Sequence, residues 1–285
     1  MNTNIYKRLS SLLCLACFLC VGCQKTNETT NENPQIPPIA QPIQPNLAPT
    51  ETQPRPPQAS NDIWDTSDVD VSKISKEKRI AFSFDDAPSR TLENILAVYA
   101  AYNESHPDCP ASATIFCNGK YINAQSPPLL ATAYAMGFEL GNHTHSHHDL
   151  TTLTEEQLRW EIDATDELLY TIDGKERHLL RAPFGKINDT VKSIVSTPLI
   201  DWTIDTLDWT GKSEDEIYRN VMENKFSGAI VLMHDGYPHT VSALKRLLPD
   251  LEKEGYQVVS ISQLAKIHHC SLKKGKVYIR ARKQS

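Results

Sequence analysis

The chain has 285 residues, of which 40% are hydrophobic and 22% are charged, and its formal net charge at pH 7 is −6. The negative net charge argues against a nucleic-acid-binding surface, and the length allows one domain with a sizeable core. Only the stretch after Cys270 is strongly basic, with six Lys and Arg residues and no acidic one. We expect this stretch, residues 271–285, to form a C-terminal tail that is either solvated or in contact with anionic polymer or lipid head groups.

Residues 1–22 have the pattern of a secretory signal peptide. Two basic residues precede an apolar stretch from Leu9 to Gly22, which is shorter than the roughly 20 residues of a membrane-spanning helix. Cys23 follows and resembles the lipobox cysteine of bacterial lipoproteins, although Cys20 stands where that motif usually has Leu. We therefore expect export to the cell envelope and attachment to a membrane through a lipid on Cys23. The alternatives are plain secretion and an uncleaved anchor.

Residues 23–62 are expected to form a tether. From Gln24 to about Ser60 the chain is rich in Asn, Thr, Gln and Pro, holds nine of the eighteen prolines and has few bulky apolar residues. Such a composition cannot bury a core. In an extended polyproline form, at about 3.1 Å per residue, the tether would reach on the order of 100 Å. An anchored domain could then search nearby polymer.

Residues 63–270 are expected to form one α/β domain, because short apolar runs alternate with polar stretches of helical length. This alternation predicts a distorted (β/α) barrel with seven parallel strands, two of them at Ala113–Cys117 and Gln257–Ile261. In such barrels the functional residues gather at the carboxyl ends of the strands. The other five runs, each with the polar residue that follows it, are Ile80–Phe84 before Asp85, Phe138–Asn142 before His143, Leu179–Leu180 before Arg181, Leu199–Ile204 before Asp205, and Ala229–Met233 before His234.

Five stretches between these runs have lengths that suit crossover helices. The spacing of Thr154 and Gln157 is typical of a helix capping box, which marks the start of the third helix. The expected helices are Thr91–Asn103, Pro128–Met136, Thr154–Thr171, Ser213–Glu223 and Val241–Lys253.

Three cysteines remain after the signal peptide and Cys23. Cys109 and Cys117 are close enough in sequence to pair in an oxidising compartment, whereas Cys270 has no identifiable partner. These three cysteines form no Cys-x-x-Cys pattern. We therefore predict no cysteine among the metal ligands.

His143 and His147 lie four residues apart between a predicted strand and a predicted helix. Two histidines alone are a weak signal, but with a carboxylate from the Asp85–Asp86 pair they form a facial set that leaves metal positions open. Two neighbouring Asp residues can divide the work, since one can bind the metal while the other accepts a proton from water. The alternative is a helix-capping Asp pair and surface histidines.

Five motifs together resemble those of the polysaccharide deacetylases, the NodB-homology domain of carbohydrate esterase family four. The resemblance covers about Arg79 to Leu264, and the motifs occur in the family's order. Ser83–Asp86 resembles Thr-Phe-Asp-Asp-Gly, His143–His147 resembles His-Ser/Thr-x-x-x-His, Arg181–Phe184 resembles Arg-x-Pro-Tyr, and Asp205–Trp209 and Leu232–His234 resemble the fourth and fifth motifs.

The resemblance implies a role for each matching residue. Asp86, His143 and His147 would hold Zn²⁺ or another divalent metal such as Co²⁺. Asp85 would be the general base, oriented by Arg181, and His234 would be the general acid, with Asp205 favouring its protonated form. Phe184 would offer a backbone N–H to the oxyanion, while Trp209 and Leu232 would line the pocket for the acetyl methyl group and the sugar ring.

The resemblance also implies a function, the removal of N-acetyl groups from a polysaccharide that contains N-acetylglucosamine. Peptidoglycan, chitin-type oligosaccharides and exopolysaccharide are all possible substrates. The alternatives are a non-catalytic polysaccharide-binding lipoprotein and a metal-dependent hydrolase of O-acetyl esters or small amides. Two residues depart from the family pattern, since Ala87 replaces Gly and Phe184 replaces Tyr. Ala87 would be strained only if its backbone needed a positive φ.

Overall fold

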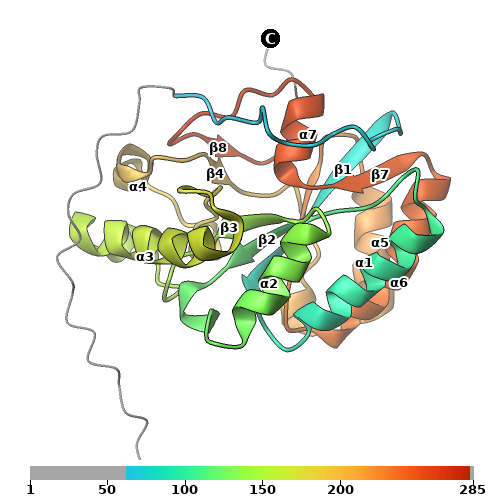
Figure 1. Cartoon of the computed structure of the whole chain (residues 1–285), viewed down its shortest axis with the longest axis horizontal. Helices are drawn as coiled ribbons and strands as arrows, with labels where there is room; N and C mark the ends of the chain where they lie inside the picture. Colours follow the sequence, from blue (N-terminus) through green and yellow to red (C-terminus); the bar gives the residue numbers. More distant parts are fainter. Residues whose placement is uncertain (1–61, 283–285) are drawn as a thin grey trace, which may run out of the picture. The chain divides into compact units, whose positions relative to one another are not determined.

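The computed structural model of the chain describes residues 62–282, and the predicted signal peptide, Cys23 and most of the tether lie outside the described residues. Helices surround a mainly parallel β-sheet, with α1, α5 and α6 together at one side and α3 and α4 at the other (Figure 1). Within residues 62–282, no helix combines the length and the apolar character that crossing a membrane requires. The predicted α/β barrel architecture is confirmed.

The central sheet has the strand order β3-β2-β1-β6-β5, and β7 pairs with the first half of β1. A bridge at Leu180 joins β3 to β4, and β4 pairs with β8. All strand pairs are parallel. The strands are β1 (Lys78–Ala87), β2 (Thr114–Cys117), β3 (Glu139–Asn142), β4 (Leu199–Ile200), β5 (Ile204–Asp205), β6 (Ile230–His234), β7 (Tyr256–Val259) and β8 (Val277–Tyr278).

Three predicted strands differ in detail from the structure, and β8 was not predicted, so residues 62–282 contain eight strands where seven were expected. The run Leu199–Ile204 forms two short strands, β4 and β5, and the run at Leu179–Leu180 contributes only isolated bridges. The last predicted strand ends at Val259, because the Ser260 side chain caps a helix that begins at the next residue. Side-chain capping of this kind satisfies backbone N–H groups that a helix start leaves unpaired.

All five predicted helices are present with small shifts at their ends, and the Thr154–Gln157 capping box begins α3 as predicted. Two short helices, α4 and α7, were not predicted. The helices are α1 (Leu92–Ser105), α2 (Ser126–Ala135), α3 (Glu155–Asp173), α4 (Asp189–Ile194), α5 (Glu214–Asn224), α6 (Pro238–Lys253) and α7 (Ile261–Ile267).

Strand β1 lies at the centre of the core. Its residues Ile80, Phe82 and Phe84 pack into the larger hydrophobic cluster, while Ala81 faces a second cluster. Strands buried on both faces are typical of parallel sheets covered by helices, which explains the continuous apolar run in the sequence. This burial gives a rigid base to the two Asp residues at the carboxyl end of β1.

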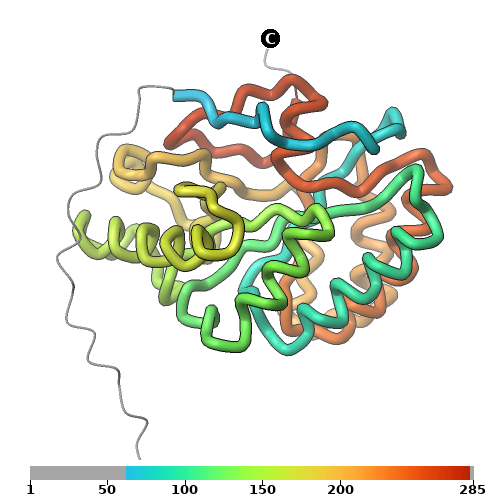
Figure 2. Tube along the Cα trace, in the orientation of Figure 1, coloured from blue at the N-terminus to red at the C-terminus, as the bar shows by residue number. Residues whose placement is uncertain are grey.

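The stretch predicted to be a basic tail is packed into the domain as far as the described residues extend. The backbone N–H of Trp64 donates to Leu272 O at 2.7 Å, and the segment that begins the described chain lies beside the C-terminal one (Figure 2). Leu272, Tyr278 and Ala281 are buried between exposed basic residues. A boundary at Cys270 would therefore cut through the core.

Cys109, Cys117 and Cys270 are separate buried thiols, so Cys109 and Cys117 are not bonded to each other.

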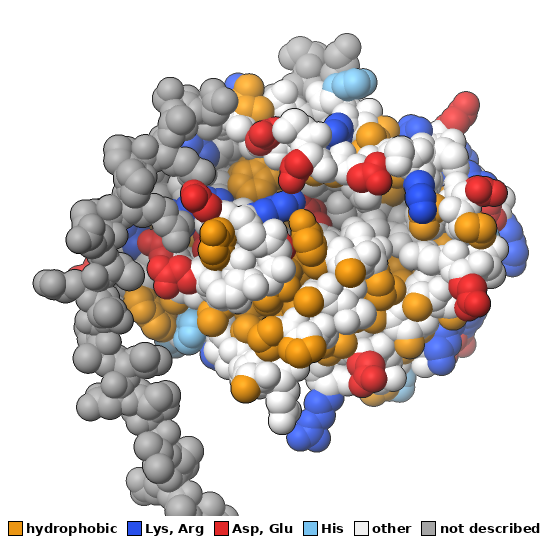
Figure 3. All heavy atoms as spheres, in the orientation of Figure 1, with side chains coloured by type: hydrophobic (Ala, Val, Ile, Leu, Met, Phe, Trp, Pro, Cys, Tyr) orange, Lys and Arg blue, Asp and Glu red, His pale blue; other side chains and the backbone are white. Residues whose placement is uncertain are grey.

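Acidic, basic and hydrophobic side chains are intermixed on the face drawn in Figure 3. That face shows no large patch that is only acidic or only basic.

Candidate metal and catalytic site

The strand ends bring most of the predicted site residues to one edge of the sheet. Asp85 and Asp86 lie near the end of β1, His143 follows β3, and His234 ends β6. The register of β1 and β6 places Asp85 directly opposite His234. Arg181 follows the bridged residue Leu180. The prediction of a shared mouth at the carboxyl ends of the strands is confirmed for these residues.

Asp86, His143 and His147 each offer one ligand atom, and the three atoms lie within 4.8 Å of one another. Asp86 Oδ1 is 3.5 Å from His147 Nε2 and 3.9 Å from His143 Nε2. His143 Nδ1 is 2.8 Å from Arg181 O. Since a carbonyl only accepts, Nδ1 carries the proton and Nε2 keeps its lone pair for a cation. The donor set fits a divalent metal.

The loop that carries both histidines is fixed by Glu161 on α3. The buried Glu161 carboxylate accepts a hydrogen bond from Ser146 N at 2.7 Å, and Glu161 O accepts one from His145 N at 2.9 Å. His145 packs against the Trp160 ring at 4.7 Å instead of joining the metal cluster. The loop therefore directs His143 and His147 to the metal cluster and His145 to Trp160.

Asp85, the predicted general base, is buried beside Arg181. Asp85 Oδ1 accepts a hydrogen bond from Arg181 Nη1 at 2.7 Å, and Arg181 itself has no exposed surface. Burial alone would raise the pKa of Asp85, but the charges of Arg181, His143 and His234 and the hydrogen bond from Arg181 hold it below its usual range. The carboxylate is therefore ionised at neutral pH.

His234, the predicted general acid, is held by Asp208 and not by Asp205. His234 Nδ1 is 2.7 Å from Asp208 Oδ1, and the backbone N–H of His234 donates to Asp208 Oδ2 at 2.8 Å. Asp205 Oδ1 instead accepts from Leu207 N at 2.8 Å. The assignment of Asp205 was wrong because Leu207 adopts a left-handed conformation with φ 56°, which turns the chain and returns Asp208 to the mouth.

From the sequence, Asp208 was only a member of the motif Asp205–Trp209, without a role of its own. The sequence offered two Asp residues three apart, and nothing in their spacing distinguished them. Thr240 Oγ1 also donates to Asp208 Oδ2, at 2.7 Å, so both oxygens of the buried carboxylate have hydrogen-bond partners. Burial lowers the pKa of His234, but the hydrogen bond to Asp208 and the charges of Asp85, Asp208 and Asp86 raise it by more.

The three predicted substrate-binding residues differ in exposure. Phe184 is 62% exposed, and its ring meets the His147 ring edge-on at 4.8 Å. Trp209 is 53% exposed, whereas Leu232 is 3% exposed and packs within the sheet. Phe184 and Trp209 can therefore offer aromatic surface to a sugar, whereas the buried Leu232 exposes almost no surface.

Ala87 carries no strain of the kind considered from the sequence. The residue with positive φ at the end of β1 is Asp86, at 63°, and Ala87 is not among the non-glycine residues with positive φ. The Cβ of Ala87 is accommodated in the core, where the residue is fully buried. Replacement of Gly at this position therefore does not distort the Asp pair.

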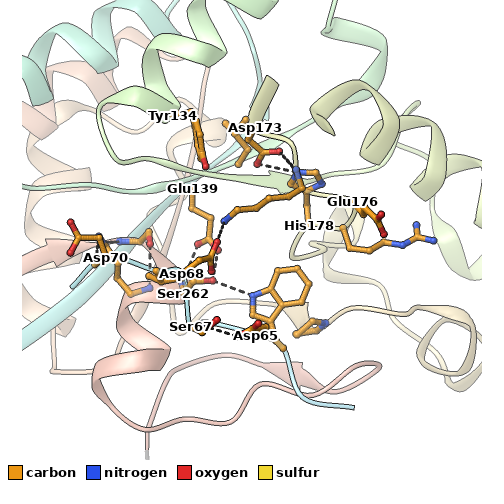
Figure 4. A pocket seen from close by; sticks show the side chains of 18 of the residues that line it. Asp65, Ser67, Asp68, Asp70, Tyr134, Glu139, Asp173, Glu176, His178 and Ser262 are labelled. Carbon is orange, nitrogen blue, oxygen red and sulfur yellow. Dashed lines mark hydrogen bonds and ion pairs between the residues drawn. The ribbon is translucent and has the colours of Figure 1, made fainter. Parts of the chain in front are cut away.

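A separate groove of about 880 Å³ lies at the opposite, amino ends of the strands. It is lined by residues that precede or begin β3 and β4, by Ser262 and its neighbours after β7, and by Asp62 and Trp64 at the start of the described chain. Figure 4 labels Glu139, His178 and Ser262 among them. His178 lies between Asp166 and Asp173. Burial would lower the pKa of His178, but these two carboxylates raise it to about 9. The groove contains none of the metal-cluster residues.

Comparison with known proteins agrees with this arrangement. A family model described as polysaccharide deacetylase matches residues 72–197. A peptidoglycan-N-acetylglucosamine deacetylase of Bacillus cereus is 35% identical over 205 residues, which cover 68% of this chain and 92% of that protein.

Other relatives are longer than the present chain. The peptidoglycan-N-acetylglucosamine deacetylase PgdA of Listeria monocytogenes is 30% identical over 196 residues, which cover 68% of this chain and 40% of that protein. The chain thus aligns with less than half the length of that relative. Among solved structures, one described as T48 deacetylase with substrate superposes with a TM-score of 0.65 at 31% identity, covering 70% of this chain and 96% of that one.

Proposed function

Because this chain belongs to the polysaccharide deacetylase family, we propose that it is a metal-dependent hydrolase that removes N-acetyl groups from a polysaccharide containing N-acetylglucosamine. The observation that carries this proposal is the placement of Asp86, His143 and His147 beside the Asp85–Arg181 and His234–Asp208 pairs. We favour peptidoglycan as the polymer, since relatives in two genera are named for it.

Asp86, His143 and His147 are the proposed metal ligands, and Zn²⁺ is the proposed ion because two imidazoles and one carboxylate suit it. When bound, such an ion would make a water more acidic and polarise the acetyl carbonyl. His143 is held for this role by its Nδ1–H, which donates to Arg181 O. The His143 side chain is therefore oriented before a metal binds.

Asp85 is the proposed general base, and the oxygen that is not bonded to Arg181 would accept the proton. Oδ1 is occupied by Arg181 at 2.7 Å, which leaves Oδ2 to accept the proton of the attacking water. Water attack on the acetyl carbon places negative charge on the carbonyl oxygen. The ring of Phe184 lies beside the ring of His147. The backbone N–H of Phe184 is the proposed donor to that oxygen, and one such donor is typically worth about 3 kcal/mol.

His234 is the proposed general acid. Its Nδ1 is hydrogen-bonded to Asp208, so Nε2 is the nitrogen left to donate a proton to the departing amine. The amide nitrogen must be protonated as the C–N bond breaks, because an amide anion is a poor leaving group. The products are acetate and the free amino sugar. The low pKa of Asp85 and the raised pKa of His234 keep base and acid in opposite charge states.

Acetate release tests the proposed function. The purified protein should release acetate from peptidoglycan or N-acetylglucosamine oligomers, lose this activity with a chelator and regain it with Zn²⁺. Acetylated xylan and small acetamides, tested in parallel, separate the esterase and small-amide alternatives. Binding of polymer without release from any substrate, by protein loaded with metal, would instead support the non-catalytic alternative.

We also propose that the protein is exported and lipid-anchored through Cys23. The support is the basic and apolar pattern of residues 1–22 followed by a cysteine in a lipobox-like setting. Mass spectrometry of the mature protein from its own cells should find Cys23 as the first residue, carrying acyl chains. A mature N-terminus at any other residue would contradict the anchor while leaving the enzymatic proposal intact.

A further inference from the structure

Asp235 follows the proposed general acid and holds the segment that carries a proposed metal ligand. Its side chain is buried and accepts hydrogen bonds from three donors of one segment, residues 86–91. Oδ2 accepts from Ser89 N at 2.5 Å, while Oδ1 accepts from Ser89 Oγ at 2.8 Å and from Thr91 Oγ1 at 2.5 Å. Every one of these bonds joins the end of β1 to the end of β6.

The backbone extends the same connection in both directions. Asp235 N donates to Asp85 O at 2.8 Å, which carries the contact between β1 and β6 one residue beyond His234. Gly236 N donates to Thr91 Oγ1 at 2.5 Å. The segment that contains Asp86 is thereby fixed at both of its ends to the residues that follow His234.

Asp86 needs such support because its own backbone conformation is unfavourable. Its φ of 63° lies in the left-handed region, which is unfavourable for a residue other than glycine. Conformations of this kind persist when surrounding contacts hold them. The Ala87 carbonyl is held on one side by Asn118 N at 2.8 Å, and Asp235 holds the residues that follow.

We propose that Asp235 is a positioning residue, which keeps the metal-ligand segment 86–91 in register with His234 and thereby sets the metal affinity of the site. The proposal rests on the metal site of the proposed function. It gives Asp235 no contact with substrate, so its effect should fall on metal binding and on turnover and not on substrate affinity.

Asp235→Asn in the full chain tests this role. An amide has one oxygen acceptor, and its NH₂ group would face donors that the carboxylate now satisfies. We expect Zn²⁺ affinity, measured by calorimetry on metal-free protein, to fall at least about tenfold, as for outer residues that orient metal ligands. With metal saturating, kcat should fall while KM stays close to that of the parent. Thr91→Val removes one donor and should weaken Zn²⁺ binding less, in the same direction.

Glu139→Gln is the matched control. Glu139 accepts hydrogen bonds from Thr114 Oγ1 at 2.8 Å and from Ser262 N at 3.1 Å, at the amino end of β3 (Figure 4). Its loss should lower the melting temperature without changing Zn²⁺ affinity.

The proposal is overturned if Asp235→Asn and Thr91→Val lower the melting temperature as Glu139→Gln does but keep the Zn²⁺ affinity of the parent. Should Asp235→Asn not fold, Thr91→Val decides by the same measurement. Metal affinity is read without substrate. A parent protein that binds Zn²⁺ but deacetylates nothing would therefore contradict the proposed function and leave the role of Asp235 open to the same test.

Discussion

His147→Ala is expected to abolish metal retention and to lower deacetylase activity by at least about a thousandfold. Metal stabilisation of the developing charge is worth several kcal/mol, and each 1.4 kcal/mol corresponds to a factor of ten in rate. His147 is one of three residues whose ligand atoms lie within 4.8 Å of one another. Two ligands that remain cannot hold the ion with comparable affinity. Metal content after dialysis and acetate release measure the two effects.

The matched control for His147→Ala lies next to it in the chain. His148 is largely exposed and contacts Glu161 at 3.1 Å, away from the metal cluster. His148→Ala should therefore keep both the metal and most of the activity. Equal loss in both variants would point to collapse of the loop, and full activity of His147→Ala would remove this residue from the metal site.

Asp208→Asn is expected to lower kcat by about a hundredfold, within the range that general acid catalysis contributes. The carboxylate accepts from His234 N and contacts His234 Nδ1 at 2.7 Å. Without its charge, the imidazole loses the interaction that favours its protonated form. Asp205→Asn is the control, because Asp205 accepts only a local hydrogen bond from Leu207 N among its side-chain contacts in residues 62–282. That variant should remain close to the parent.

The pH dependence separates a loss of the acid from a loss of structure. As the proposed general acid, His234 would act in its protonated form, so activity should be present below its pKa and decline as the pH rises through it. Because Asp208 raises the pKa of His234, Asp208→Asn should move the alkaline limb of the rate profile to lower pH. An unchanged alkaline limb with a well-folded variant would show that Asp208 does not control His234.

The strands, helices and metal cluster were predictable because each depends on local sequence. Apolar runs such as Ile80–Phe84 predict buried strands, and polar residues after parallel strands meet at one edge. The pair His143 and His147 could therefore be placed with the Asp85–Asp86 pair from the sequence alone, and the family resemblance indicated Asp86 as the ligand. The Arg181–Asp85 contact followed from the family resemblance, and the structure contains it at 2.7 Å.

The partner of His234 and the hydrogen bonds of Asp235 were not predictable, because they depend on contacts between segments that are distant in the sequence. Asp205 and Asp208 are equivalent in spacing, and only the left-handed turn at Leu207 decides which of them reaches the mouth. Asp235 contacts residues 144 or more positions earlier in the chain. No local pattern marks a contact of that range.

The C-terminal stretch was misassigned for a different reason. Its Lys and Arg residues suggested a solvated tail, but Leu272, Tyr278 and Ala281 are buried between them. Charged side chains whose heads stay in water do not prevent the residues between them from packing. The number of charged residues therefore gave no indication that exposed and buried positions alternate in this stretch.

The two ends of the strands face opposite directions, and this separates the start of the described chain from the metal cluster. Asp62 begins the described chain beside the amino-end groove, where Lys274 N donates to Asp62 O at 3.0 Å. The metal cluster lies at the carboxyl ends. The start of the described chain and the metal cluster therefore lie at opposite ends of the strands. A substrate can reach the metal cluster without meeting the segment that begins at Asp62.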